Sequence, residues 1–134
     1  MRIRTKILVV DDSSNVQMLV KAFVAEEGYV VILAEDTLQA TVLAVRDKPS
    51  LIILDIGLPG GDGWMLMDRL KTNTLTRMIP ILVVTGQSRQ GLNEKAQTKG
   101  AAGFLNKPLE KPALLAAVKQ ALTPPATPNT SASV

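Results

Sequence analysis

The sequence predicts an α/β domain in which helices cover both faces of a five-stranded parallel sheet, a doubly wound arrangement. Four short apolar runs are continuous rather than alternating, which is typical of strands buried on both faces. Between the runs lie segments with apolar residues at helical spacing. The length of 134 residues suits one compact core.

The apolar runs give the predicted strands in chain order, namely Ile7–Val10, Tyr29–Ala34, Leu51–Leu54 and Ile81–Val84. A fifth and weaker strand is predicted at Gly103–Leu105, where the apolar run is shorter. Because strands alternate with helical segments, consecutive strands are expected to run parallel.

Apolar stripes at helical spacing give the predicted helices and the side chains that should face the core. Helix by helix, these side chains are Val16, Leu19, Val20, Phe23 and Val24; Leu38, Val42 and Val45; Trp64, Leu66, Met67 and Leu70; and Leu114, Leu115, Val118 and Leu122. The segment Gln87–Lys99 offers only Leu92 and Ala96, so its helix should be the least firmly packed. Gly28 stands where the first helix should end.

Cysteine and histidine are both absent from the sequence. The absence of cysteine excludes disulfides, thiol nucleophiles and thiolate metal sites, and the absence of histidine excludes histidine-dependent hydrolases. Any chemistry must therefore use carboxylates, hydroxyls, lysine or the backbone. Such a set of donors suits a hard, oxygen-liganded cation such as Mg²⁺.

Charge is distributed unevenly along the chain. Residues 1–68 hold six Lys/Arg against ten Asp/Glu, a net −4, and residues 69–134 hold nine against two, a net +7. The nine cations are scattered and aromatic residues are few, so we do not expect this domain alone to bind nucleic acid.

No apolar run reaches the length of a membrane helix, and we expect a cytoplasmic protein.

The composition divides the chain into a domain over residues 1–122 and a tail over 123–134. The tail holds three prolines among Thr, Ser, Ala and Asn, carries no charged side chain, and has little to bury. We therefore expect a flexible tail or the start of a linker there.

Polar residues follow the predicted strands at the points where they end: Asp11 and Asp12, then Asp55, Thr85 and Lys107. Sites in open parallel sheets form at the carboxyl ends of the strands, so these side chains should converge. Three carboxylates held close together need a cation among them. The set is suited to binding a phosphoryl group, although Asp11 and Asp12 alone would equally suit a helix N-cap.

These residues, in this order, resemble the receiver domain of two-component response regulators. Asp55 precedes Thr85 by 30 residues, and Thr85 precedes Lys107 by 22, both of which are usual spacings in that family. The loop from Asp55 to Gly63 is similar to the family's D-x-x-[LM]-P-x-x-D-G segment. The similarity extends from about Lys6 to Leu122 and implies a flavodoxin-like fold.

The resemblance implies that Asp55 is the phosphoacceptor and takes its phosphoryl group from a phosphohistidine. The donor would be a sensor histidine kinase or a histidine phosphotransfer protein. Mg²⁺, or Mn²⁺ in its place, would be held by Asp12 directly, by Asp11 mainly through water, by Asp55, and by the backbone carbonyl of Gly57. The domain would be a regulatory switch rather than an enzyme, catalysing only its own phosphotransfer and dephosphorylation.

The resemblance also implies how the switch responds. Lys107 would pair with a phosphoryl oxygen, and Thr85 would move its hydroxyl onto the phosphoryl group. The vacated space would let Phe104 turn inward, and the surface over residues 87–122 would change to control a downstream partner or output domain. Pro108 would follow a cis peptide bond.

Other functional classes remain open at this point. A phosphatase or phosphotransferase resembling the haloacid dehalogenases also uses an Asp nucleophile, but it begins with D-x-D, which is absent here. A flavin or dinucleotide binder would suit the sheet, yet no G-x-G-x-x-G follows the first strand. A third possibility is a binding module that keeps the fold and is never phosphorylated.

Overall fold

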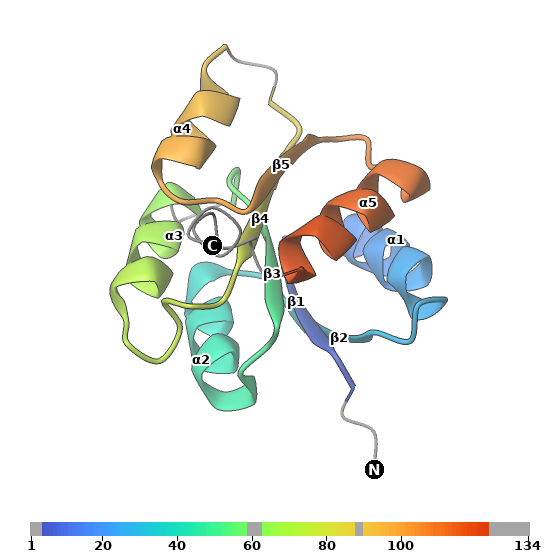
Figure 1. Cartoon of the computed structure of the whole chain (residues 1–134), viewed down its shortest axis with the longest axis horizontal. Coiled ribbons are helices and arrows are strands. Elements are labelled where there is room, and N and C mark those ends of the chain that lie inside the picture. The colour runs from blue at the N-terminus through green and yellow to red at the C-terminus, as the bar shows by residue number, and fades with distance from the viewer. Residues whose placement is uncertain (1–3, 59–62, 88–89, 124–134) are drawn as a thin grey trace, which may run out of the picture.

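The computed structural model describes residues 4–58, 63–87 and 90–123, in which strands and helices alternate from end to end (Figure 1). The strands are β1 (Lys6–Val10), β2 (Val30–Ala34), β3 (Leu51–Asp55), β4 (Ile81–Thr85) and β5 (Gly103–Asn106). The helices are α1 (Ser14–Ala25), α2 (Thr37–Asp47), α3 (Gly63–Thr72), α4 (Leu92–Thr98) and α5 (Lys111–Leu122). Each predicted strand is confirmed to within one residue at either end.

The strands form one parallel sheet in the order β2-β1-β3-β4-β5. Helices α2, α3 and α4 cover one face, and α1 and α5 cover the other (Figure 1). This is the predicted doubly wound architecture. The register pairs Val10 with Leu54, Asp55 with Val84, and Thr85 with Asn106, so the carboxyl ends of four strands lie along one edge.

The hydrophobic core is split into two clusters by the sheet, one on each face. Every residue of β3 and β4 is buried, because these strands have neighbours on both sides and helices on both faces. That arrangement explains why their sequences are continuous apolar runs up to the last residue of each, Asp55 and Thr85. The edge strand β2 is only half-buried along most of its length.

Helix α2 presents a different face to the sheet from the predicted one. Leu38 and Val42 are 75% and 52% exposed, whereas Ala40 and Ala44 are fully buried. The prediction was wrong because the small alanines allow close packing on the sheet, and the larger side chains lie on the outer surface. In α1, Val20 and Val24 face the core as predicted.

The core face predicted for α1 agrees with the structure only in part, and the prediction for α4 agrees in full. In α1, Leu19 is 38% exposed, contrary to the prediction that it faces the core. Helix α4 is the shortest and is anchored by Leu92 and Ala96 alone, as predicted.

Residues 124–134 of the predicted tail lie outside the described residues. None of the helices described here has the length and apolar character needed to span a membrane.

Candidate functional site

Three carboxylates gather at the carboxyl edge of the sheet. Asp11 directly follows β1, Asp12 comes next, and Asp55 is the last residue of β3. Each offers a carboxylate oxygen, and these oxygens all lie within 4.8 Å of one another. Asp11 and Asp55 are buried, and Asp12 is exposed to solvent. The predicted acidic cluster is therefore present, with one member open to the surface.

Lys107 places a single ammonium group between two of these carboxylates. Its Nζ lies 2.8 Å from Oδ2 of Asp11 and donates a hydrogen bond of 3.2 Å to Oδ2 of Asp55. Burial alone would lower the pKa of Lys107, but the charges and contacts of Asp11 and Asp55 outweigh that effect and raise it. The ammonium therefore stays charged and partly balances the acidic cluster.

The carboxylate of Asp11 is tightly oriented. Its Oδ1 accepts a hydrogen bond of 2.9 Å from the backbone N–H of Ser13. Its buried Oδ2 has no hydrogen bond donor with favourable angles among the described residues, so the contact with Lys107 is an ion pair. Burial raises the pKa of Asp11, and the charge of Asp55 adds to the rise although Lys107 and Ser13 oppose it.

Such a buried carboxylate oxygen suits a divalent cation. Mg²⁺ takes oxygen ligands, commonly one or two carboxylates with water and phosphate oxygens completing the set. The cluster offers carboxylate oxygens close enough together to share one ion. Among the described residues, the buried Oδ2 of Asp11 has no hydrogen-bond partner, so the residues present fit the metal.

The side chain of Asp55 is also oriented by a backbone hydrogen bond at this edge. Its Oδ1 accepts a hydrogen bond of 2.9 Å from the backbone N–H of Gly57. A Cβ at Gly57 would lie 3.5 Å from Oδ1 of Asp55 and 3.8 Å from Nε2 of Gln87, which are ordinary contacts. There is thus room for one added carbon atom at Gly57, beside the Asp55 carboxylate.

Thr85 ends β4 and is fully buried. Its Oγ1 accepts a hydrogen bond of 3.0 Å from the backbone N–H of Gln87. The backbone carbonyl of Thr85 in turn accepts a hydrogen bond of 2.8 Å from the N–H of Lys107. Thr85 is therefore joined to Lys107 through the backbone, and its hydroxyl is directed to the β4–α4 loop.

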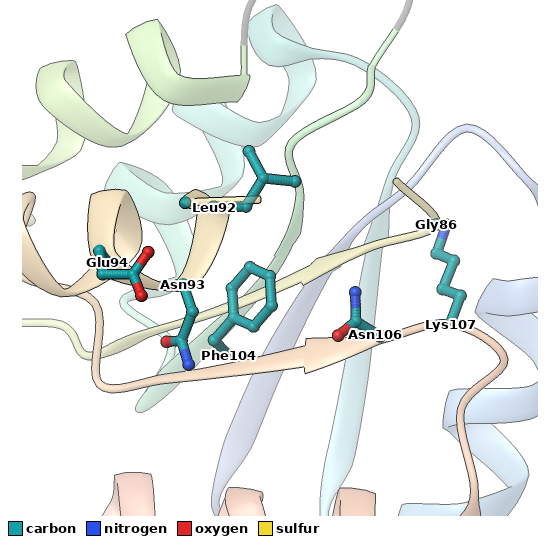
Figure 2. A pocket seen from close by; sticks show the side chains of 8 residues that line it. Gly86, Leu92, Asn93, Glu94, Phe104, Asn106 and Lys107 are labelled. Carbon is teal, nitrogen blue, oxygen red and sulfur yellow. The ribbon is translucent and has the colours of Figure 1, made fainter. Parts of the chain in front are cut away.

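Phe104 lies on β5 at the edge of a cavity of about 430 Å³. Figure 2 shows its ring directed toward Leu92 of α4, with Lys107 farther along the chain and extending toward Gly86. The ring is partly buried and packs against the core cluster beneath α4. The peptide bond between Lys107 and Pro108 is cis, as expected.

Two polar residues at this edge were missed by the sequence analysis. Gln17 of α1 is buried and contacts the backbone of Asp11, and Asn106 donates a hydrogen bond of 3.2 Å to the backbone carbonyl of Gln87. Gln17 directly follows Val16 of the predicted apolar stripe, and a polar side chain at that point of the sequence could have indicated a buried hydrogen bond. Residues 59–62 of the predicted motif lie outside the described residues.

Comparisons with known proteins agree with this geometry. The family model described as the response regulator receiver domain matches residues 7–119. The response regulator PleD of Caulobacter vibrioides is 38% identical over 115 residues, 85% of this chain and 25% of PleD. Protein PilH of Pseudomonas aeruginosa is 29% identical over 117 residues, 87% of this chain and 97% of PilH.

Solved structures of similar proteins have the same fold. The chemotaxis protein CheY4 of Vibrio cholerae is 27% identical, with a TM-score of 0.82 over 90% of this chain and 100% of that one. A putative response regulator from Chloroflexus aurantiacus is 31% identical, with a TM-score of 0.84 over 90% of this chain and 98% of that one.

The chain spans 25% of the length of PleD and 51% of the length of the phosphate regulon regulator PhoB of Pseudomonas aeruginosa. None of these matches favours a haloacid-dehalogenase-like enzyme or a module that is never phosphorylated. The chain belongs to the response regulator receiver domain family, whose members are phosphorylation-activated signalling switches.

Proposed function

We propose that Asp55 accepts a phosphoryl group from a phosphohistidine on a partner, either a sensor histidine kinase or a histidine phosphotransfer protein. A carboxylate oxygen of Asp55 forms the new bond to phosphorus as the bond from phosphorus to the imidazole nitrogen breaks. The imidazole keeps that electron pair. The observation that supports this role best is the position of Asp55, beside two further carboxylates and 3.2 Å from the Lys107 ammonium.

Asp11, Asp12 and Asp55, with the backbone carbonyl of Gly57, are the residues that would hold Mg²⁺ or Mn²⁺. A bound divalent ion neutralises charge on the phosphoryl oxygens and on the carboxylates. Asp12, the exposed member, would bind the ion directly, and Asp11 would contact it mainly through a bound water, as the family resemblance implies. Lys107 can release one carboxylate and pair with a phosphoryl oxygen.

The switch that we propose is a two-state equilibrium biased by the new charge at Asp55. Thr85 exchanges its hydrogen bond from Gln87 for one that its hydroxyl donates to the phosphoryl group. Phe104 turns inward, and the surface over residues 87–122 alters its contact with a downstream partner or output domain. Helix α4 is the natural element to move, because only Leu92 and Ala96 anchor it in the core.

This role is regulatory, with catalysis limited to the domain's own phosphotransfer and dephosphorylation. It suits a cytoplasmic protein that meets a histidine kinase there. The partner must supply the histidine, since this chain contains none. Nucleic acid is not expected as a ligand of this domain alone.

Incubation with Mg²⁺ and acetyl phosphate, followed by intact mass measurement, tests the proposal. The wild type is expected to gain one phosphoryl group, and Asp55→Asn is expected to gain none. Asp47→Asn is a matched control, because Asp47 lies on α2 and pairs with Arg46 away from the site. Equal adduct formation on the wild type and Asp55→Asn would show that Asp55 is not the acceptor.

Hydrogen exchange tests the conformational part separately. Amides of α4 are compared with Mg²⁺ alone and with Mg²⁺ plus beryllofluoride, which mimics the phosphoryl group. We expect exchange in α4 to change, while β3 serves as an internal reference. Trp64 offers a second probe, because it is the single tryptophan and Nζ of Lys95 on α4 lies 4.8 Å from its ring centroid. Unchanged exchange and fluorescence would contradict the proposed movement.

A further inference from the structure

Gln17 is a buried polar residue on the inner face of α1. Only 6% of its surface is exposed, and it lies on the same helix face as the core residues Val20 and Val24. Its Nε2 donates a hydrogen bond of 2.8 Å to the backbone carbonyl of Asp11 and one of 3.3 Å to that of Ala34. The amide therefore joins the carboxyl ends of β1 and β2 at the edge that holds the acidic cluster.

The backbone of Asp11 is consequently fixed on both sides. Its N–H donates a hydrogen bond of 3.0 Å to the carbonyl of Ala34, and its carbonyl accepts the bond from Gln17. The Ser13 N–H then holds Oδ1 of the side chain. With these three bonds in place, Oδ2 is the remaining polar atom of Asp11, and it is the atom that lies against Lys107 at the site.

The local sequence explains why this residue can reach the strand end. Helix α1 begins right after the acidic pair, with Ser13 as its N-cap, and the N–H of Gln17 donates a hydrogen bond of 3.0 Å to the Ser13 carbonyl. Gln17 is therefore in the first turn, close to the acidic pair. An apolar side chain there would fill similar space in the core but would leave two buried carbonyls without this donor.

We propose that Gln17 is a positioning residue for the metal site, acting through the backbone of Asp11 and the adjoining Asp12. This inference rests on the proposed function, because it takes the acidic cluster as the Mg²⁺ site. Residues that hydrogen-bond to metal ligands without binding the metal commonly weaken metal affinity about 10- to 100-fold when they are removed. Gln17 would act without binding the metal itself, because its side-chain amide donates to the backbone carbonyls of Asp11 and Ala34.

The test is the Mg²⁺ dissociation constant of Gln17→Met, measured by titration calorimetry. Methionine is close in size to glutamine and has no donor, and we expect binding to weaken by about 10-fold or more. Thr76→Val is the matched control, because Thr76 is 1% exposed and its Oγ1 donates a hydrogen bond of 2.7 Å to the Leu70 carbonyl, between α3 and β4. It should lose comparable stability and keep the wild-type Mg²⁺ affinity.

A double-mutant cycle with Asp11→Asn shows whether the effect passes through Asp11. If it does, Gln17→Met should weaken Mg²⁺ binding much less in the Asp11→Asn background than in the wild type. Gln17→Asn, which retains the amide on a shorter side chain, gives a milder variant should Gln17→Met unfold, and it should also weaken binding. Wild-type affinity in the folded Gln17 variants would overturn the inference alone, whereas no Mg²⁺ binding by the wild type would overturn the proposed function as well.

Discussion

Substitution of Gly63 by alanine should disturb both the fold and the site. Gly63 is the first residue of α3, and a Cβ there would lie 2.4 Å from the Cα of Ile56, 2.8 Å from its carbonyl oxygen and 2.9 Å from its carbonyl carbon. Carbon atoms in favourable contact are about 3.5–4.0 Å apart, so the methyl group would lie more than about 1 Å too close to the Cα of Ile56. These atoms are backbone atoms and cannot rotate away.

The expected cost follows from that overlap. Overpacking of a core usually costs about 1–3 kcal/mol, and contact with fixed backbone places Gly63→Ala near the upper end. Alanine is favoured over glycine inside helices by about 1 kcal/mol, and by less at a helix end. The net loss should be about 2 kcal/mol, which for a domain of this size lowers Tm by about 8 °C.

Thermal unfolding with and without Mg²⁺ is the assay. Gly57→Ala is the control, because the atom nearest to its added Cβ would be Oδ1 of Asp55 at 3.5 Å, which is an ordinary contact. We expect a change below about 0.5 kcal/mol for the control. Gly63→Ala should also bind Mg²⁺ more weakly, since Ile56 lies between Asp55 and Gly57. The reasoning fails if both variants unfold at the same temperature.

Three further predictions concern the site. Gly57→Asn places a polar side chain beside Asp55, where it can hold water, so phosphate release should accelerate; a wild-type release time course would contradict this. Lys107→Met leaves two buried carboxylates without their ammonium and should lower the metal-free unfolding free energy by about 2 kcal/mol in urea titrations; an unchanged midpoint would oppose it. Burial raises the pKa of Asp11 in the folded state above its usual value of 3.8, so its contribution to stability is present below pH 3.8 and is lost as the pH rises through the folded-state pKa. The metal-free wild type should therefore lose stability relative to Asp11→Asn between pH 3.8 and the folded-state pKa. Parallel stability-against-pH profiles of the two proteins would refute this.

Much of the fold was predictable because its central elements have one dominant signal. The β3 and β4 strands are apolar up to their last residues, Asp55 and Thr85, and such a short continuous apolar run is typical of a strand covered on both faces. The α2 helix has two competing signals, since Leu38 and Val42 stand four residues apart on one face while Ala40 and Ala44 stand four residues apart on another. Hydrophobicity favoured the larger pair, whereas close packing on the sheet selected the alanines.

The acidic cluster was predictable because parallel strands bring their carboxyl ends together. The sequence does not specify which atoms make contact across the site. Lys107 contacts both Asp11 and Asp55, and this depends on the register of β5 and the path of the chain after it. The bond from Gln17 to Asp11 depends on how closely α1 approaches the strand ends, which apolar spacing does not define.

Locating the phosphoryl group by chemical trapping tests the central claim most directly. After reaction with acetyl phosphate and Mg²⁺, borohydride reduces an aspartyl phosphate to homoserine, and peptide mapping identifies the position. We predict homoserine at position 55, with Asp11 and Asp12 recovered intact. Homoserine at position 11 or 12, or a phosphoryl group found on a hydroxyl such as that of Thr85, would contradict the assignment of Asp55 as the phosphoacceptor.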